Sequence, residues 1–420
     1  MQKILFLGFP IILIPFFLIT GPLIPDAIVT IGSLLFLVFI FYKKKIYLFN
    51  NKFLIFFLIF WIFISLNSFF SGNLISIKSS FTYLRFGLFM ILLIYLSNYY
   101  ENFHNKFKNI ILFSFLILFF DSIFQYSFGF NILGYEKTSR ISSFFGDELI
   151  MGSYVIKLFP LFVFLYFFQN QKILITYTLL SLILISLLLI FLSGERSALG
   201  LYFLYIFLLS FVLFDNFKSY LIYIISIIFL SSIILINFDH LRYRFVTQFF
   251  NDLKIKTEKI VGETENIKES KSINKLYIFT KAHNQMIVTS YKMFLDKPLT
   301  GHGSKSYRLK CNDIKYYAND DEKFCSTHPH NYYLQMLAEN GLIGFLFISI
   351  VFFYFFISFF KNIFSGKRKK LVNLIYLANI INFWPVIPHG NFFNNWISIT
   401  IFLSLGFYLS LRNQDVLKNQ

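Results

Sequence analysis

Charged side chains are scarce in this chain of 420 residues. Asp, Glu, Lys and Arg together make up 14% of the sequence, whereas hydrophobic residues make up 57% and aromatic residues 22%. A soluble domain could not bury that much apolar surface and still present a polar exterior. The composition therefore excludes a soluble globular protein and predicts an all-α polytopic membrane protein.

Cysteine is nearly absent. Cys311 and Cys325 are the only two, which excludes a disulfide-rich scaffold, and no second Cys or His pair stands at zinc-finger spacing. A single disulfide between them and two separate thiols both fit the sequence. The number of cysteines leaves this point open.

Long apolar runs are abundant, by contrast. A helix of about 17 to 22 apolar residues can cross roughly 30 Å of hydrocarbon. Pro10, Pro15 and Pro22 interrupt the first run and no small-residue cleavage site follows it, so we expect a retained span rather than a signal peptide. In all we expect about 12 transmembrane helices, near 4–23, 27–42, 53–71, 82–98, 109–130, 150–168, 173–192, 198–214, 220–238, 342–360, 372–388 and 396–411.

The net charge is +17, and most of the basic residues lie in the segments between these runs. Short segments on the side of the two termini hold sixteen Lys and Arg residues, whereas short segments on the other side hold four. By the positive-inside rule, both termini are predicted to be cytoplasmic. The charge is thus interpreted as a topology signal, and no nucleic-acid partner is expected because no basic stripe coincides with a reading module.

This topology divides the chain into three parts. Residues 1–238 hold the first nine helices, 239–335 form a large, partly helical periplasmic loop, and 336–420 hold the last three helices and a cytoplasmic C-terminus. Within the loop, 252–275 is rich in Lys, Glu, Ser and Asn and is interpreted as a solvated insertion without chemistry.

The segment 327–344 places a polar helix start directly before an apolar run. Pro329 suits a first helical turn, Ser326 or Thr327 could cap it, and Asn340-Gly341 indicates a stop or bend. The helix is therefore predicted to begin at His330, with Asn331 beside it. There the helix dipole would disfavour a protonated imidazole and keep a neutral, basic His near pH 7. A capping His at a wet membrane interface is the alternative.

Four arginines are predicted on the same outer side: Arg140, Arg196, Arg242 and Arg244. Arginines at helix ends often extend toward lipid headgroups, which is one interpretation of each. Several converging guanidinium groups also suit the oxygens of a lipid diphosphate, which they can bind in a bidentate manner.

Arg85, Asp121 and Lys157 are ionisable residues inside predicted spans. An unpaired charge in hydrocarbon is costly, so such residues are usually paired or functional. We expect them to form one internal ion-pair network, with a structural role for Asp121.

A neutral His that accepts a proton from a hydroxyl, together with arginines that bind a diphosphate, is suited to transferring a group from a lipid diphosphate to an alcohol. The outer loops contain no Asp-x-Asp pair of the kind that holds Mg²⁺, so no metal is expected. A secondary transporter or lipid flippase is a competing class, although no symmetry between the halves is visible and the outer loop is long for a transporter. A receptor or assembly partner would leave the arginines and His unexplained.

Several motifs resemble those of the bacterial O-antigen ligase and O-antigen polymerase superfamily. They are His330-Asn331 with Leu334, Glu339, Gly341 and Gly344 after it, the "Pro-Leu-x-Gly-x-Gly" turn in 296–303, the arginine-bearing link 193–200, and the segments 144–154 and 388–396. The resemblance is most specific over about 175–360.

The resemblance implies a membrane-embedded glycosyltransferase of the GT-C type in the bacterial inner membrane, with its active face in the periplasm. The donor would be an undecaprenyl-diphosphate-linked glycan and the acceptor a sugar of the lipid A core or a second lipid-linked glycan, with no metal or cofactor. His330 would be the general base, with His328 as the other candidate, and Arg196 the firmest diphosphate ligand. Arg140, Arg242, Arg244 and Asn331 would contact substrate less certainly. Ligase and polymerase share this chemistry and are not separated by the sequence.

Overall fold

The computed structural model describes residues 2–169, 177–214, 216–253, 281–316, 325–365 and 369–418. Across these residues the fold is helical, and the β-structure is limited to one isolated bridge between Phe130 and Glu136. The predicted insertion at 252–275 lies outside the described residues apart from its first two.

The first predicted span, 4–23, is not one continuous helix. It is divided into α1 (Gln2–Leu5), α2 (Gly8–Ile12), α3 (Ile14–Phe17) and a 3₁₀ turn, η1 (Leu18–Thr20). Pro10 and Pro15 lack the backbone N–H that a helix interior requires, and Gly21 then turns the chain at a φ of 111°. The proline interruptions expected from the sequence are thus present, and the assignment of 4–23 as a retained span stays a prediction.

Each of the other eleven predicted spans overlaps a helix. Eight described helices are long and apolar enough to cross a membrane, and α10 is apolar but shorter. The total of about twelve spans stays a prediction. The helices that overlap these eleven predicted spans are α4 (Leu23–Tyr42), α5 (Lys52–Phe70), α6 (Leu74–Thr82) with α7 (Leu84–Tyr99), α8 (Phe103–Phe128), α9 (Met151–Gln169), α10 (Tyr177–Ser193), α11 (Arg196–Leu213), α12 (Phe217–Asn237), α17 (Tyr332–Phe364), α18 (Lys370–Asn382) and α19 (Asn395–Lys418).

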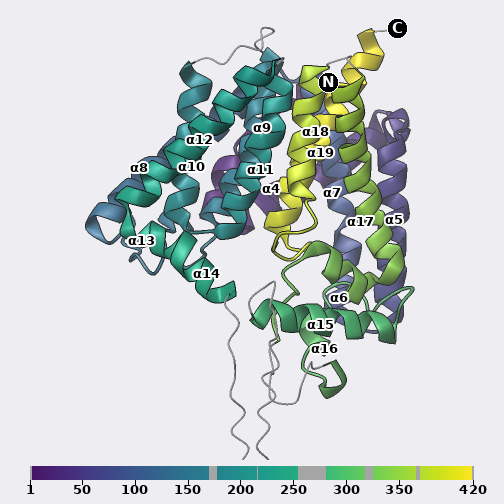
Figure 1. Cartoon of the computed structure of the whole chain (residues 1–420). Coiled ribbons are helices and arrows are strands. Elements are labelled where there is room, and N and C mark those ends of the chain that lie inside the picture. The colour runs from purple at the N-terminus through teal and green to yellow at the C-terminus, as the bar shows by residue number, and fades with distance from the viewer. Residues whose placement is uncertain are drawn as a thin grey trace, which may run out of the picture.

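These helices form one bundle with α9 at its centre (Figure 1). In the apolar stretch of α9, 89% of the residues are buried inside the protein, compared with 17% in that of α12 at the periphery. α9 packs against α8, α10, α11 and α18, while α7 packs against α19 and α4. A side chain on α9 therefore faces protein rather than lipid, which bears on the position of Lys157.

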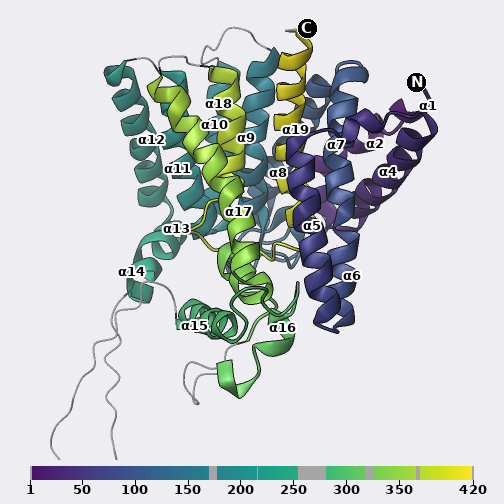
Figure 2. The ribbon, with the colours of Figure 1, turned by 90° about the vertical axis from the view of Figure 1, so that its right-hand side faces the viewer.

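Both termini lie at one end of the bundle, and the segment that connects α12 to α17 lies at the other (Figures 1 and 2). That segment carries α13 (Asp239–Arg242), a π-helical turn, η4 (Tyr243–Thr247), α14 (Gln248–Leu253), α15 (Lys281–Asp296), α16 (Tyr307–Lys310) and a 3₁₀ turn, η5 (Ile314–Tyr316). The arrangement agrees with a chain whose termini share one side of a membrane.

α17 is broken at Gly341, which has a φ of 60°. The amides of Leu342 and Ile343 donate to the carbonyls of Pro298 (2.8 Å) and Leu299 (3.3 Å), so the 296–303 turn caps the second half of the helix. A Cβ at Gly341 would lie 2.4 Å from the carbonyl carbon of Leu299. The predicted bend at Asn340-Gly341 is thus confirmed, and only glycine fits it.

The two cysteines form a disulfide. Their Cα atoms lie 5.3 Å apart, with Cys311 directly after α16 and Cys325 at the start of the segment leading to His330. Of the two alternatives that the sequence left open, the structure has the bridged one.

The three ionisable residues inside spans do not form one network. Arg85 pairs with Asp26 of α4 at 2.9 Å. Asp121 instead accepts hydrogen bonds from the Ser143 hydroxyl and from the Ile132 amide, both in the loop after its own helix. The predicted common network was wrong because each charge is satisfied by the element nearest to it. The structural role predicted for Asp121 is confirmed, since it holds this loop.

Candidate active site

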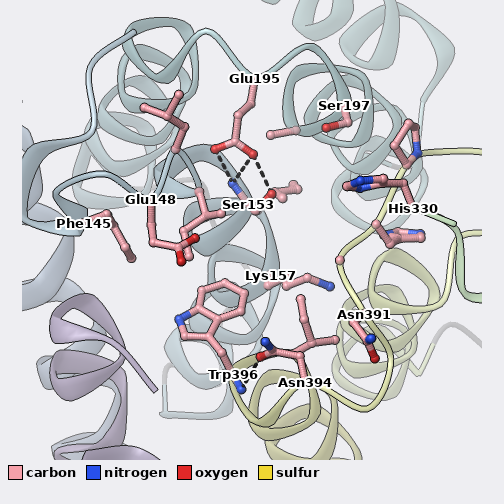
Figure 3. Close-up of a pocket in the computed structure, with 18 of the residues that line it drawn as sticks. Phe145, Glu148, Ser153, Lys157, Glu195, Ser197, His330, Asn391, Asn394 and Trp396 are labelled. Atoms are coloured by element: carbon pink, nitrogen blue, oxygen red, sulfur yellow. Dashed lines mark hydrogen bonds between the residues drawn. The ribbon is translucent and has the colours of Figure 1, made fainter. Parts of the chain in front are cut away.

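A cavity of about 1130 Å³, which we call the central cavity, lies where α9 and α11 meet the outer loops (Figure 3). Its described lining includes four histidines, two carboxylates and six basic side chains. The histidines are His283, His328, His330 and His389, the carboxylates Glu148 and Glu195, and the basic residues Arg140, Lys157, Arg196, Arg244, Lys305 and Arg308. The cavity is therefore strongly cationic and suits an anionic ligand.

Five of the seven site residues predicted from the sequence line the central cavity. They are Arg140, Arg196, Arg244, His328 and His330. Arg242 and Asn331 are not among the lining residues. Arg242 pairs with Asp239 one turn earlier, with its side chain 53% exposed. The contact of Arg242 with substrate stays a prediction.

Arg196 and Arg244 each donate a hydrogen bond to the backbone of the segment that carries the other. Arg196 is the first residue of α11, and its Nε donates to the carbonyl of Arg244 at 3.1 Å. The Nε of Arg244, in the π-helical turn, donates to the carbonyl of Gly194 at 3.2 Å, and one terminal nitrogen donates to the Gln248 side chain at 2.7 Å. Both guanidinium groups are therefore fixed at the wall of the cavity rather than extended along a lipid surface.

Glu195, which was not predicted as a site residue, accepts hydrogen bonds from the first turn of α9. Its carboxylate accepts from the amide of Gly152 at 2.7 Å and from the hydroxyl of Ser153 at 2.6 Å, at the helix start where amides lack partners (Figure 3). Burial raises the pKa of Glu195, while the Ser153 hydrogen bonds and Arg140 act in the opposite direction. Its place beside Arg196 at a tight link was the available signal.

His330 precedes the helix rather than opening it. α17 begins at Tyr332, and the side-chain oxygen of Asn331 accepts from the amides of Tyr333 (2.9 Å) and Leu334 (3.1 Å). Asn331 is thus the N-cap, so the prediction that Ser326 or Thr327 caps a helix starting at His330 was wrong. Asn331 also donates to the carbonyl of Pro385 at 2.7 Å. Its contacts are with the protein backbone.

The ring of His330 faces the central cavity among other polar rings. Its Nε2 lies 3.4 Å from the hydroxyl of Ser326, and its centroid lies 4.2 Å from that of His328 and 5.8 Å from that of His283. Burial, and next the neighbouring His283, lower the pKa of His330 below its usual 6.5. The ring is therefore neutral at pH 7, for a reason other than the helix dipole.

His328 is less available than His330. Its Nδ1 lies 2.9 Å from the hydroxyl of Thr327, its Nε2 is buried, and only 9% of the residue is exposed. Burial lowers the pKa of His328 to about 3, so it stays neutral as well. Of the two histidines, His330 has the more accessible ring.

The backbone of His330 is held by a residue far along the chain. His330 has a φ of 52°, a strained value for a side chain of this kind, and its carbonyl accepts from the amide of His389 at 2.7 Å. The ring of His389 stacks on that of Tyr332 at 4.2 Å, and Lys157 lies 3.3 Å from the Tyr332 hydroxyl. The late Pro388-His389-Gly390 segment thus fixes the conformation of His330.

Part of the chain matches a known protein family. Residues 179–349 match the model of the O-antigen ligase family. None of the curated proteins matches the chain. The matched segment runs from α10 through the broken part of α17 and includes Arg196, Arg244, His328 and His330. This match covers less than half of the chain and supports a relationship to the superfamily of O-antigen ligases and O-antigen polymerases.

Proposed function

We propose that this protein is an O-antigen ligase-like glycosyltransferase. It would move a glycan from a polyprenyl diphosphate, such as undecaprenyl diphosphate, onto a sugar hydroxyl of the lipid A core. The observation that supports this most is the central cavity itself, in which Arg140, Arg196 and Arg244 line the same space as His330. The family match supports glycosyltransferase-type activity.

The diphosphate of the donor would bind at Arg196 and Arg244. A leaving diphosphate gains negative charge as its bond to the sugar breaks, and fixed guanidinium groups stabilise such charge in a site with little water. The Nε hydrogen bonds of both residues orient their guanidinium planes before substrate arrives. Arg140 would add charge from the loop between α8 and α9, where its side chain lies beside Gly194.

His330 would act as the general base. Its neutral ring takes the proton of the acceptor hydroxyl, the oxygen forms a bond to the anomeric carbon, and the bond from that carbon to the diphosphate oxygen breaks. A positioned base of this kind contributes roughly 10² to 10⁴ in rate. His328 is the second candidate for the same role.

No metal or cofactor has a part in this proposal. The arginines supply the positive charge that a divalent ion supplies in other phosphate-processing sites. Transfer by the purified protein should therefore continue in a chelator, and loss of activity on removal of divalent ions would contradict the proposal.

We propose further that the chain crosses the bacterial inner membrane about twelve times, with both termini cytoplasmic and the central cavity facing the periplasm. Reporter fusions after Lys45, Lys108, Lys218 and Lys370 should then indicate cytoplasm, and one inserted within 254–275 should indicate periplasm. A cytoplasmic result for the insertion would separate His330 and Arg196 from any exported lipid-linked glycan.

The decisive experiment reconstitutes the protein in vesicles with a polyprenyl-diphosphate-linked glycan and lipid A core. Glycan-bearing core that forms with wild-type protein and not with His330→Ala supports the proposal, and its absence with wild-type protein contradicts it. A polymerase with the same chemistry is the alternative. In a strain lacking the protein, core without any repeat unit indicates a ligase, and core bearing a single repeat unit indicates a polymerase.

A further inference from the structure

The central cavity has more positive charge than one diphosphate requires. Arg140 lies in the loop between α8 and α9, Arg196 is the first residue of α11 and Arg244 lies in the π-helical turn, and all three supply the donor side in the proposed function. Lys305 and Arg308 line the same cavity but come from a different part of the chain, directly after the 296–303 turn. That reaction gives them no role.

The backbone at Lys305 and Arg308 is held firmly against α17. The carboxylate of Glu339 accepts from the amides of Lys305 at 2.8 Å and Tyr307 at 3.1 Å, and also from the side chain of Gln335 at 2.9 Å. Lys305 itself has a φ of 59°. Two backbone hydrogen bonds to one buried carboxylate thus hold a non-glycine residue in this conformation, which is a feature of built sites rather than of loose loops.

The side chains of Lys305 and Arg308 lack partners of opposite charge. Among the described residues, no carboxylate oxygen forms an ion pair within 4 Å of either charged group. The carboxylate of Glu339 instead accepts from the amides of Lys305 and Tyr307 and from the Gln335 side chain. The Nε of Arg308 is buried without a hydrogen-bond partner. Buried polar groups are nearly always satisfied, so an orphaned guanidinium nitrogen in a cavity wall indicates a ligand that is absent here. Burial and the nearby Arg308 lower the pKa of Lys305, as expected for two cations placed close together.

The position of this pair relative to His330 indicates which substrate it would contact. Arg308 is a charged neighbour of His328, and the ring of His328 lies 4.2 Å from that of His330. In a displacement at carbon, the incoming hydroxyl approaches on the side opposite the leaving group, and the base must reach that hydroxyl. With the leaving group on the arginines of α11 and the π-helical turn, the acceptor lies on the side of the base.

We propose that Lys305 and Arg308 form a second anion site, which binds a phosphate group of the acceptor glycolipid. This inference rests on the proposed function and adds the substrate class that the acceptor must have. The phosphate could belong to a phosphorylated core or to the diphosphate of a second lipid-linked glycan. In either source the pair recognises phosphate oxygens, with Arg308 able to supply two parallel N–H donors.

The test measures the acceptor and donor KM separately in vesicles that hold wild-type protein, Lys305→Gln, Arg308→Gln or Lys310→Gln. Lys310 is the matched control because it lies on α16 with Arg308 but does not line the cavity. Loss of a hydrogen bond to a charged group should raise the acceptor KM about 10- to 100-fold in the two cavity variants. The donor KM should stay unchanged, and Lys310→Gln should behave as wild type.

A second set of measurements uses acceptors that lack phosphate. Wild-type protein should lose affinity for a dephosphorylated core, or for a neutral glycoside in place of a lipid diphosphate, by the same factor as Arg308→Gln loses for the intact acceptor. Arg308→Gln should lose nothing more on the same change. The acceptor for which this holds identifies the source of the phosphate.

Two outcomes would overturn the inference: an acceptor KM that is unchanged in Arg308→Gln, or one that rises together with the donor KM. Arg308→Lys keeps the charge and should retain more affinity than Arg308→Gln, which separates binding from misfolding. Absence of transfer by the wild-type protein would instead contradict the proposed function, so the two failures can be told apart.

Discussion

Arg196 and Arg244 each use the Nε of the guanidinium to hold backbone that belongs to the other's segment. Arg196 donates to the carbonyl of Arg244 at 3.1 Å, and Arg244 donates to the carbonyl of Gly194, two residues before Arg196, at 3.2 Å. The link before α11 and the π-helical turn are thereby joined across 48 residues of sequence. Removal of either guanidinium should disturb the position of both.

Replacing Arg196 with Lys should therefore impair glycan transfer nearly as much as replacing it with Ala. Lysine keeps the charge but lacks the Nε donor and the planar fork, so we expect a loss of about 10- to 100-fold in kcat/KM for either change. Arg242→Lys is the matched control, because Arg242 is exposed and paired with Asp239. Wild-type activity in Arg196→Lys would mean that this residue only anchors the chain.

Replacing His330 with Ala should lower turnover by at least about 100-fold, because a positioned proton acceptor is lost. The melting temperature should change little, since the hydrogen bond from His389 is to the backbone carbonyl of His330 and remains. His328→Ala should have a smaller effect on turnover, as its ring is more buried. If His328→Ala were inactive and His330→Ala active, the roles of the two histidines would be exchanged.

The pH profile should show an acid limb below 6.5. Burial and His283 lower the pKa of His330, so the neutral base is fully present above the usual value and is lost only as the pH falls through the lowered one. His283→Gln removes the charge effect of one neighbour and should move the limb upward, toward 6.5. This can be measured as kcat/KM against pH in both proteins, and a limb that moves downward would contradict the assignment of the base.

Replacing Gly341 with Ala should destabilise the protein. The φ of 60° alone costs on the order of 1–3 kcal/mol for a residue with a side chain, and the new Cβ would overlap the backbone of Leu299. Gly200→Ala is a suitable control, because Gly200 lies within α11 and its nearest neighbour would be the Ile387 side chain at 3.6 Å. Thermal unfolding should show a lower melting temperature for the first variant and an equal or higher one for the second.

Hydropathy predicted the helices well because a membrane span requires a continuous apolar run, and the same signal located the loops between them. At 4–23 two prolines break an apolar run into short helices, as their positions in the sequence indicate. The expected ion-pair network of Arg85, Asp121 and Lys157 rested only on their depth within predicted spans. Depth does not give the direction in which a side chain points around its helix, and Arg85 faces Asp26 instead.

The arginines at helix ends and the His-Asn pair were recognisable because a charge beside a span is unusual in sequence. Lys305, Arg308 and His283 carried no such signal, since basic residues are common in a long outer loop. Only the fold of that loop against α17 brings them to the cavity. The capping role of Asn331 was missed for a different reason. Ser, Thr and Asn are all good caps, and the sequence does not say which of Ser326, Thr327 and Asn331 precedes the first turn.

The break at Gly341 has a mechanical consequence. The 296–303 turn is hydrogen-bonded to both sides of the break, so the first half of α17, this turn and the strained segment at Lys305 are held together as one unit. The arginines of the donor side are built on α11 and the π-helical turn, outside that unit. In the proposed reaction, base and leaving group would therefore be held by two different units, and α18 connects these units because it packs against α9, α11 and α17. Substitutions in the buried contacts between these helices should therefore change the distance between His330 and the arginines, although the substituted residues contact neither.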